Sequence, residues 1–543
     1  MLKYLFLCIC LCGCTSKQQT FTGGAVAADH YLASQAGVEI LAKGGNAVDA
    51  AVATSFALSV VRPFSCGIGG GGFMLIDSPT MEPVALNYRE TAPGKVGSDF
   101  FKTNSSRFGG TAVGVPGTVA GLLMAHERFG KLSRQEILAP AIRLAKSAIK
   151  LDAAFENAVK SATGSIEKLP KEQQEVYLKA LQSITTQFSH LNSGQEFPLQ
   201  RIAEEGAAGF YEGDVAKLIV QATGGHLTLS DLKSYEPRWE TPLRFNIGNG
   251  NVVIAMPPPS SGGVAIAQII GLLSRVYALD YGVSQEYTQL LIESMKHAFA
   301  DRAEHLADAA YVDVPIDTLL DEAYLDELAS RIVLGETQEI YSYGSVSPPP
   351  DDDGTSHFCV VDKDGMMVSA TETINTSFGS LAYSPVLGFM LNNEMDDFSS
   401  PSGANVYGLR QSDNNLPEPG KRPLSSMSPT MIEKNGVPVL ALGASGGPRI
   451  ISSVVQVMLN ISWFGDEPIE ALRRARVHHQ WLPDKVYMEE TYRDNESESF
   501  LLSTGYSLMP RVNIGVVQVI QVEDGVIKPA CDPRKGGKPA GIK

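Results

Sequence analysis

Two threonines near the middle of the chain have the residue type and the spacing for nucleophilic chemistry. Thr355 opens a run rich in apolar and β-branched residues, and Thr373 closes a second such run. The loop between the runs, Lys363-Asp364-Gly365, has the form of a three-residue hairpin turn with glycine at its left-handed position. Pairing the strands across this turn sets Thr355 opposite Thr373. A hydroxyl that faces a second hydroxyl at the start of a strand is a candidate nucleophile.

The stretch before Thr355 predicts that the chain is cut there. Residues 348–353 are three prolines and three aspartates, which neither continue a helix nor fit a sheet interior. Gly354 allows the close backbone approach needed if the Thr355 hydroxyl attacks the Gly354 carbonyl, giving an ester that water opens. The freed α-amine of Thr355 would titrate at about 7.7–8.0 and act as the general base. An ordinary linker before a hairpin is the alternative for this stretch alone.

Two further patterns are suited to binding negative charge. Arg89 ends a strand-like run, where its guanidinium could hold a carboxylate by two parallel hydrogen bonds; a structural salt bridge is the alternative. Gly446 and Gly447 lie between a strand-like and a helix-like segment. Consecutive backbone N–H groups at such a turn form an anion-binding nest, and a plain strand-to-helix turn is the alternative. His357 shares a strand face with Thr355, but we expect it to be structural, because the α-amine is the preferred base.

The elements that must position these residues are of both kinds. Residues 22–75 predict the order strand, helix, helix, strand, and 437–443 and 388–392 predict two later strands. The glycine-rich run 67–72 lacks the Gly-Lys-Ser/Thr ending of a phosphate-binding loop, so we expect it to serve close packing of a helix on a sheet. Residues 399–420 form a polar loop of a length typical of lids. The pattern mixes helices and strands but does not fix the order of strands in a sheet.

The composition is that of a globular protein that does not bind nucleic acid. At 543 residues the chain is too long for one simple core, and it predicts two structural units or one large layered one. The net charge of −16 argues against a nucleic-acid partner. Beyond the N-terminal region only Cys66, Cys359 and Cys531 remain, which is neither a disulfide framework nor a zinc-binding pattern.

The N-terminus predicts export. Lys3 precedes a short apolar run and a small-residue site, the pattern of a secretory signal over residues 1–13. Residues 11–14 resemble a bacterial lipoprotein cleavage box, with Cys14 as the lipidated residue and an N-terminal lipid as the membrane anchor. We therefore expect a periplasmic protein or a membrane-anchored lipoprotein; a plainly secreted protein is the alternative.

Taken together, these motifs resemble the gamma-glutamyltranspeptidase (glutathione hydrolase) family of N-terminal-nucleophile hydrolases. The resemblance extends over nearly the whole chain after the signal, and the order and spacing of its motifs are near those of the family. The motifs that carry it are RETAP at 89–93, GTSH at 354–357, LNNEMDDF at 391–398, RPLSSMSPT at 422–430 and GG at 446–447.

The resemblance implies a fold, a maturation step and a set of site residues. The fold is α+β, an αββα sandwich of two stacked, mainly antiparallel sheets between helical layers. Cleavage gives a large subunit, 14–354, and a small subunit, 355–543, with an N-terminal catalytic threonine. The implied roles are these: Thr355 as nucleophile, Thr373 as its hydrogen-bond partner, Gly446 and Gly447 as oxyanion-binding amides, Arg89, Ser425 and Ser426 for the substrate α-carboxylate, and Asn375, Glu394 and Asp397 for its α-amino group.

The implied activity is transfer of the γ-glutamyl group of glutathione and related compounds to water or to amino acid and dipeptide acceptors. It runs through a γ-glutamyl ester on Thr355 and needs neither a metal nor an organic cofactor. The polar loop 399–420, with Tyr407, resembles the lid of some members. Two alternatives share this fold: an amidohydrolase like the cephalosporin or glutaryl acylases, and a non-catalytic surface binding protein. A glutaryl group has no α-ammonium, so the pair of Arg89 and Asp397 argues against the first.

Overall fold

The computed structural model describes residues 17–147, 149–190, 194–278, 282–346, 354–400, 411–490 and 495–543. The expected lipidation site Cys14 and the lid residue Tyr407 lie outside these ranges. Within the described ranges, no helix combines the length and the apolar character needed to cross a membrane.

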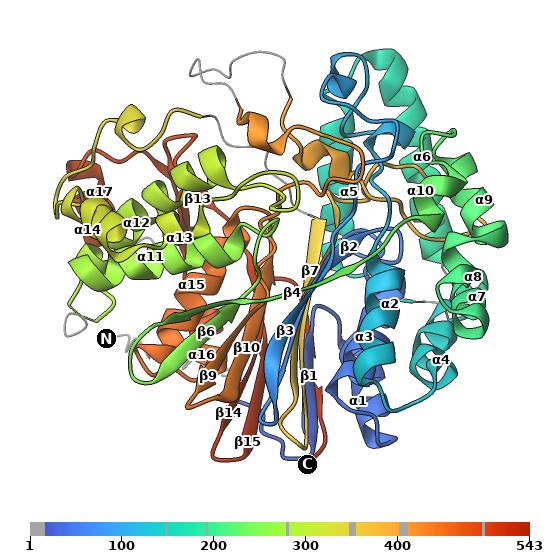
Figure 1. Cartoon of the computed structure of the whole chain (residues 1–543), viewed down its shortest axis with the longest axis horizontal. Coiled ribbons are helices and arrows are strands. Elements are labelled where there is room, and N and C mark those ends of the chain that lie inside the picture. The colour runs from blue at the N-terminus through green and yellow to red at the C-terminus, as the bar shows by residue number, and fades with distance from the viewer. Residues whose placement is uncertain are drawn as a thin grey trace, which may run out of the picture.

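Two antiparallel sheets form the centre of the molecule (Figure 1). The first sheet has seven strands in the order β16 (Ala540–Gly541), β1 (Gly24–Ala28), β7 (Gly354–Asp362), β8 (Met367–Asn375), β2 (Gly71–Ser78), β3 (Met81–Tyr88) and β4 (Arg238–Glu240). The second has six, in the order β15 (Val526–Cys531), β14 (Val516–Glu523), β10 (Val437–Ser445), β9 (Thr430–Lys434), β6 (Asn251–Ala255) and β5 (Leu243–Asn246). A small third sheet joins β11 (Val477–His478), β12 (Val486–Glu489) and β13 (Leu508–Arg511).

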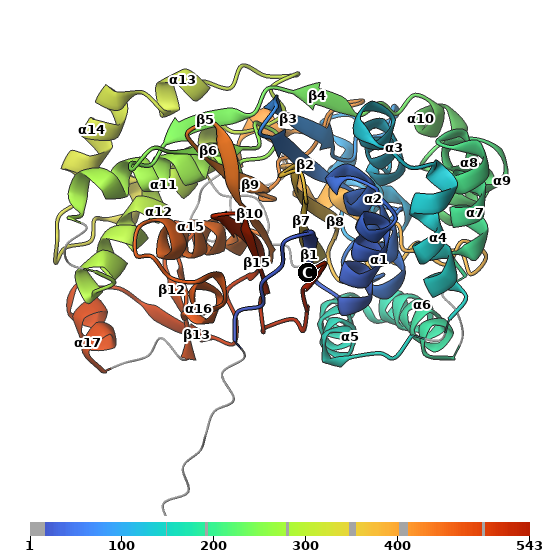
Figure 2. The same cartoon turned by 90° about the horizontal axis from the view of Figure 1, so that it is seen from below.

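Helices cover the outer face of each large sheet, as both cartoon views show (Figures 1 and 2). Beside the first sheet lie α1 (Tyr31–Ala42), α2 (Ala47–Val61), α3 (Thr118–Phe129), α4 (Arg134–Ala145), α5 (Ala153–Ile166), α6 (Lys171–His190), α7 (Glu196–Glu205), α8 (Ala208–Tyr211), α9 (Gly213–Ala222) and α10 (Leu229–Lys233). Beside the second lie α11 (Gly262–Val276), α12 (Gln285–His305), α13 (Ile316–Leu319), α14 (Glu322–Ser330), α15 (Arg449–Ser462), α16 (Pro468–Arg473) and α17 (Asn495–Ser503).

Strand β7 shows how the sequence builds these layers. All nine of its residues are buried. Phe358 and Val360 pack in the cluster that includes the apolar faces of α1 and α2, whereas Cys359 and Val361 pack in the cluster between the two sheets. A strand that is apolar on both faces is what a layer covered on both sides requires. The expected αββα sandwich is confirmed, and Thr355 belongs to the face of β7 that looks toward the second sheet.

The hairpin register is confirmed, the strand expected at 388–392 is wrong, and the expected packing of the glycine run holds in part. Thr355 pairs with Thr373, and Gly365 takes the left-handed conformation with φ of 85°. Residues 388–392 do not form a strand. Met390 makes a single bridge, and the backbone groups of Leu391 and Asn392 bond to separate segments, at Ala382 and Gly69, rather than along one neighbouring strand. The glycine run serves mainly close packing of strands, since a Cβ on Gly70 would lie 1.9 Å from the Thr373 carbonyl oxygen, whereas Gly67 packs against Ser59 of helix α2.

Candidate active site

The two hydroxyls of the hairpin lie together at the buried end of β7. The Thr355 and Thr373 Oγ1 atoms are 3.4 Å apart, and both residues are almost fully buried. Thr373 Oγ1 donates to the carbonyl oxygen of Gly354 at 2.6 Å and accepts from the Asn375 backbone N–H at 2.8 Å. A hydroxyl has one proton to give, so the Thr355 hydroxyl is the donor between the two threonines. This orientation leaves lone pairs of Thr355 Oγ1 available for attack.

The backbone is irregular at the expected cleavage site. The register shifts between Gly354 and Thr355, where Gly354 lies opposite Asn375 and Thr355 opposite Thr373. Asn375 has a positive φ of 73°, a conformation that non-glycine residues adopt at a cost. A Cβ on Gly354 would lie 2.4 Å from the Thr376 carbonyl carbon, so only glycine fits there. The glycine before the threonine is therefore required by packing.

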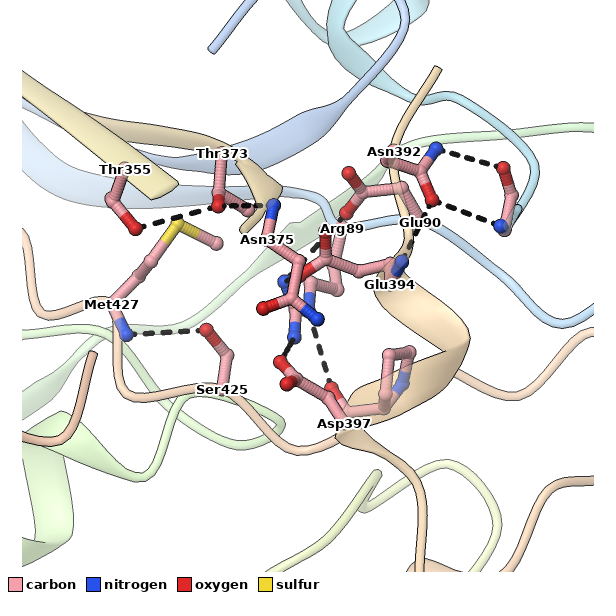
Figure 3. A network of polar contacts seen from close by, with 12 residues as sticks. Arg89, Glu90, Thr355, Thr373, Asn375, Asn392, Glu394, Asp397, Ser425 and Met427 are labelled. Atoms are coloured by element: carbon pink, nitrogen blue, oxygen red, sulfur yellow. Dashed lines mark hydrogen bonds and ion pairs between the residues drawn. The ribbon is translucent and has the colours of Figure 1, made fainter. Parts of the chain in front are cut away.

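A buried guanidinium and two carboxylates form the second part of the site (Figure 3). Arg89, at the end of β3, donates to a carboxylate oxygen of Glu394 and, at 2.5 Å, to Asp397 Oδ2. It is 1% exposed, and its remaining hydrogen bonds go to the backbone carbonyls of Pro423 and Leu424. Burial raises the pKa of Asp397, while the adjacent Arg89 opposes that shift. The set carries both signs of charge, as binding the two charged groups of an α-amino acid requires.

Asn375 reaches this set from the other strand of the hairpin. Its side-chain Nδ2 donates to the Asn393 carbonyl at 3.0 Å, whereas its buried Oδ1 has no hydrogen-bond partner among the described residues. A buried acceptor without a partner is costly. Asn375 thus offers an acceptor to a ligand that carries N–H groups.

The two neighbouring serines lie differently. Ser425 Oγ accepts from the Met427 N–H at 3.1 Å, and its backbone carbonyl accepts from Ser261. Ser426 Oγ instead accepts from Arg302 Nη2 at 2.9 Å. The structure therefore positions both hydroxyls, but the one on Ser426 is shared with a second buried guanidinium.

Gly446 and Gly447 lie in the turn between β10 and α15, as expected. Their φ values of 128° and 60° are in the region that favours glycine. The Lys535 ammonium bridges the end of β10 to Thr355, donating to the Thr355 carbonyl at 2.7 Å and to Ser445 Oγ at 3.4 Å. The start of β7 and the end of β10 are thus held next to each other.

Two residues of the site, one buried and one partly buried, were not predicted from the sequence. The Glu90 carboxylate lies 3.7 Å from Arg89 Nη1, and burial raises its pKa to about 7. Its place beside Arg89 in the RETAP motif was the available signal. Lys535 pairs with Asp29 at 2.6 Å as well as binding Thr355, and no local pattern marked it. Lys535 acts through contacts between segments that are remote in sequence.

His357 and Cys359 point elsewhere. His357 makes hydrogen bonds to Thr371 and Cys359, and burial lowers its pKa to about 3. A ring that stays neutral and packs against Gly443 of the facing sheet fits the expected structural role. Burial also raises the pKa of the Cys359 thiol, which fits a core residue.

The described ends of the expected lid are tied to the site. Asn415 Nδ2 donates to the Asp397 carbonyl at 2.7 Å, and Asn415 Oδ1 accepts from the Leu424 N–H at 3.0 Å. Ser412 Oγ donates to the Glu304 carbonyl on α12. This loop therefore joins the segment of Asp397 to the segment of Ser425.

Comparison with known proteins agrees with this geometry. Residues 33–542 match the family model described as Gamma-glutamyltranspeptidase. The chain is 37% identical to the glutathione hydrolase proenzyme of Escherichia coli (strain K12), with 94% of this chain and 90% of that protein covered.

Two solved structures are also similar. A cephalosporin acylase from Bacillus halodurans has a TM-score of 0.84 at 26% identity and covers 97% of both chains. A gamma-glutamyltranspeptidase from Pseudomonas nitroreducens, complexed with L-DON, has a TM-score of 0.54 at 37% identity, covering 59% of this chain and 98% of that one. Fold and site define an N-terminal-nucleophile hydrolase. Within that class, the chain belongs to the gamma-glutamyltranspeptidase family.

Proposed function

We propose that this protein is a self-cleaving γ-glutamyltransferase and glutathione hydrolase with Thr355 as its nucleophile. The observation that carries the proposal is the placement of two hydroxyls, Thr355 and Thr373, beside a buried set of Arg89, Glu394 and Asp397 (Figure 3). A γ-glutamyl group carries an α-carboxylate, an α-ammonium and a γ-carbonyl. The guanidinium suits the carboxylate, the two acidic side chains with Asn375 Oδ1 suit the ammonium, and the threonine pair suits the carbonyl.

The acylation step follows from these positions. Thr355 Oγ bonds to the γ-carbonyl carbon and passes its proton to the α-amine of Thr355, which cleavage has freed. The tetrahedral oxyanion accepts hydrogen bonds from the N–H groups of Gly446 and Gly447. When the carbon–nitrogen bond breaks, the ammonium returns the proton to the leaving amine. With glutathione, cysteinylglycine leaves and a γ-glutamyl ester stays on Thr355.

The ester is then open to two acceptors. Water attacks the ester carbonyl in hydrolysis, and the amine of an amino acid or dipeptide attacks it in transfer. In both reactions the α-amine accepts a proton from the attacking group. It then donates a proton to Thr355 Oγ as the ester bond breaks, which restores the hydroxyl.

Maturation uses the same hydroxyl. Thr355 Oγ attacks the carbonyl carbon of Gly354, the peptide nitrogen leaves with a proton as the α-amine of Thr355, and water opens the ester. The Thr373 hydroxyl polarises this carbonyl from 2.6 Å. The products are a large subunit, 14–354, and a small subunit, 355–543. The proenzyme named among the relatives supports this two-subunit maturation.

The similarity to a cephalosporin acylase raises the other candidate activity. Glutaryl and related acyl groups have a terminal carboxylate but no ammonium. For such a substrate, Glu394 and Asp397 would be two buried carboxylates beside an acyl chain that offers them no cation. The charge pattern therefore favours γ-glutamyl donors.

The proposed location is outside the cytoplasm. The basic residue and apolar run that precede Cys14 support an exported protein, and the box at 11–14 supports a lipid-anchored one. Mass spectrometry of the purified N-terminal peptide decides between a lipidated Cys14 and a plainly cleaved signal.

One experiment tests the function and the maturation together. The full-length chain and its Thr355→Ala variant are expressed, and their intact masses and N-terminal sequences are determined. We expect the wild type to give two fragments, the smaller beginning Thr-Ser-His, and to hydrolyse L-γ-glutamyl-p-nitroanilide but not glutaryl-p-nitroanilide. The variant should stay one inactive chain. The proposal would be contradicted by a folded wild type that remains uncut, or by one that hydrolyses the glutaryl amide faster than the γ-glutamyl amide.

A further inference from the structure

A polar cavity lies next to the backbone of the proposed nucleophile. Its volume is about 240 Å³, and Ser65, Ser445, Gly446 and Lys535 are among its lining residues. Lys535 donates to the Thr355 carbonyl, so the wall of this cavity contacts the backbone of the nucleophile. None of the residues that bind the α-amino acid end of the donor lines it. A group attached to the γ-carbonyl through its amide nitrogen must extend away from that end, and this cavity includes Gly446 of the oxyanion turn.

The cavity is lined by four cationic side chains and by no aspartate or glutamate. Two of these cations form ion pairs with carboxylates that do not line the cavity. Arg534 pairs with Glu489 at 2.5 Å and with Asp532 at 3.0 Å, and Lys535 pairs with Asp29. Arg511, which has no such carboxylate partner among the described residues, adds positive charge to the wall of the cavity. This is a local excess of positive charge in a chain of net charge −16.

Arg511 is the cation best suited to meet a ligand. It ends β13, is partly exposed, and forms no ion pair with a carboxylate in the part of the chain that the structure describes. Its cross-strand neighbour is Glu489, but that carboxylate binds Arg534 and the Ile514 N–H. The Arg511 guanidinium lies 5.6 Å from the centre of the Tyr487 ring, which limits its orientations.

The loop that carries Arg511 to the oxyanion turn is firmly held. Arg476 donates to the carbonyls of Ile514 and Gly515, and Ser453 Oγ donates to the Ile514 carbonyl at 2.8 Å. The Cα atom of Gly515 lies 3.1 Å from the position that a Cβ on Gly446 would take.

Two residues of this loop face the cavity. Val512 is 87% exposed, whereas Arg511 and Asn513 on either side of it line the cavity. The guanidinium is therefore presented to the cavity by a fixed backbone.

We propose that Arg511 binds the carboxylate of the leaving dipeptide and of peptide acceptors in this cavity, and so makes the enzyme selective for acceptors with a free C-terminus. The proposal rests on the γ-glutamyl transfer proposed above. Arg449, the first residue of α15, adds its charge and the positive end of its helix to the same wall. Arg511 would be a specificity-determining residue, since it acts on a part of the substrate remote from the reacting bond.

Two acceptors that differ only in charge test this subsite. With L-γ-glutamyl-p-nitroanilide as donor, we expect the purified wild type to have a KM for glycylglycine about tenfold below that for glycylglycinamide. The Arg511→Gln variant should raise the glycylglycine KM about tenfold and leave the glycylglycinamide KM and the hydrolysis of the donor without acceptor within about twofold. Arg511→Lys should fall between the two.

The matched control is Arg128→Gln. Arg128 also lies over aromatic rings, those of Phe129 and Trp239, but it does not line the cavity. It should leave both KM values unchanged. Equal KM values for the two acceptors in the wild type, or a parallel loss for both acceptors and for hydrolysis in Arg511→Gln, would overturn the subsite. If that variant does not fold, the wild-type comparison alone decides. A wild type without activity on the donor contradicts the proposed function instead, so the two failures are distinct.

Discussion

The hydroxyl of Thr373 donates a hydrogen bond of 2.6 Å to the carbonyl oxygen of Gly354, the group on which cleavage of the chain would act. The same hydroxyl accepts a hydrogen bond from Thr355, the proposed nucleophile. One side chain therefore contacts both the proposed nucleophile and the carbonyl of the bond that we propose is cut.

The first prediction concerns this double contact. Thr373→Val keeps the shape of the side chain but removes the hydroxyl, so we expect cleavage after Gly354 to slow by about a hundredfold or more. Thr373→Ser should stay within about tenfold of the wild type. The rate is measured as the disappearance of the full-length chain on denaturing gels, with the melting temperature as a check on folding. A folded Thr373→Val variant that matures at the wild-type rate would contradict the role.

The second prediction concerns the charge that holds Arg89. Asp397→Asn keeps the size of the side chain and removes one negative charge from the ammonium site. We expect the KM for a γ-glutamyl donor to rise about tenfold or more while cleavage of the chain proceeds normally. Asp396→Asn is the matched control, because Asp396 binds Ser106 and Arg107 rather than Arg89. Equal effects of the two variants would show that Asp397 acts only through the fold.

The third prediction separates the backbone of Asn375 from its side chain. Asn375→Gly fits the φ of 73° but loses the Oδ1 acceptor and the Nδ2 hydrogen bond to Asn393, so we expect a raised donor KM and the smaller loss of stability of the two variants. Asn375→Val is β-branched and unsuited to positive φ, so it should lower the free energy of unfolding by about 1–3 kcal/mol. Thermal unfolding and donor kinetics of the two variants give the comparison. A higher melting temperature for Asn375→Val than for Asn375→Gly would refute the backbone argument.

The fourth prediction is a pH dependence of stability from Glu372. Its carboxyl is buried against Ser55 and Tyr88, and burial raises its pKa to about 7 from an ordinary value of 4.5. The neutral form is therefore favoured in the folded state. Its contribution to stability is complete below about pH 4.5, declines as the pH rises, and is lost above about pH 7. The shift corresponds to about 3 kcal/mol.

Glu372→Gln carries no proton to lose, so it should remove this part of the decline between pH 4.5 and 7. Urea unfolding at several pH values measures it, and Glu127→Gln, at an exposed position, is the control. If the Glu372→Gln curve parallels the wild type across this range, the carboxyl does not titrate as described.

The part of the site that local pattern could predict is the hairpin. Strand periodicity and one glycine turn fixed the pairing of Thr355 with Thr373, because a hairpin register depends only on residues close in sequence. The αββα layering came from the resemblance to a family, since strand order depends on contacts between distant segments. Lys535 illustrates the limit: it lies 180 positions from Thr355 and meets it only after both sheets are assembled. The expected strand at 388–392 was wrong because the backbone groups of Leu391 and Asn392 bond to segments remote in sequence or in a turn, at Gly69 and Ala382, which the local pattern does not reveal.

In the first sheet, β7 and β8 lie between β1 and β2, so strands from after the expected cut are inserted between strands from before it. Residue 541 near the C-terminus pairs in turn with Ala25 of β1. Cutting one peptide bond would thus give two polypeptides that share one folding unit and one core. The two polypeptides could separate only if the hydrogen bonds of β7 with β1 and of β8 with β2 were broken. Neither polypeptide alone contains all the strands of the sheet. Only the uncut chain can fold from an unfolded state as one molecule. After the expected cut, the folded state would be reached again only if two separate polypeptides associated.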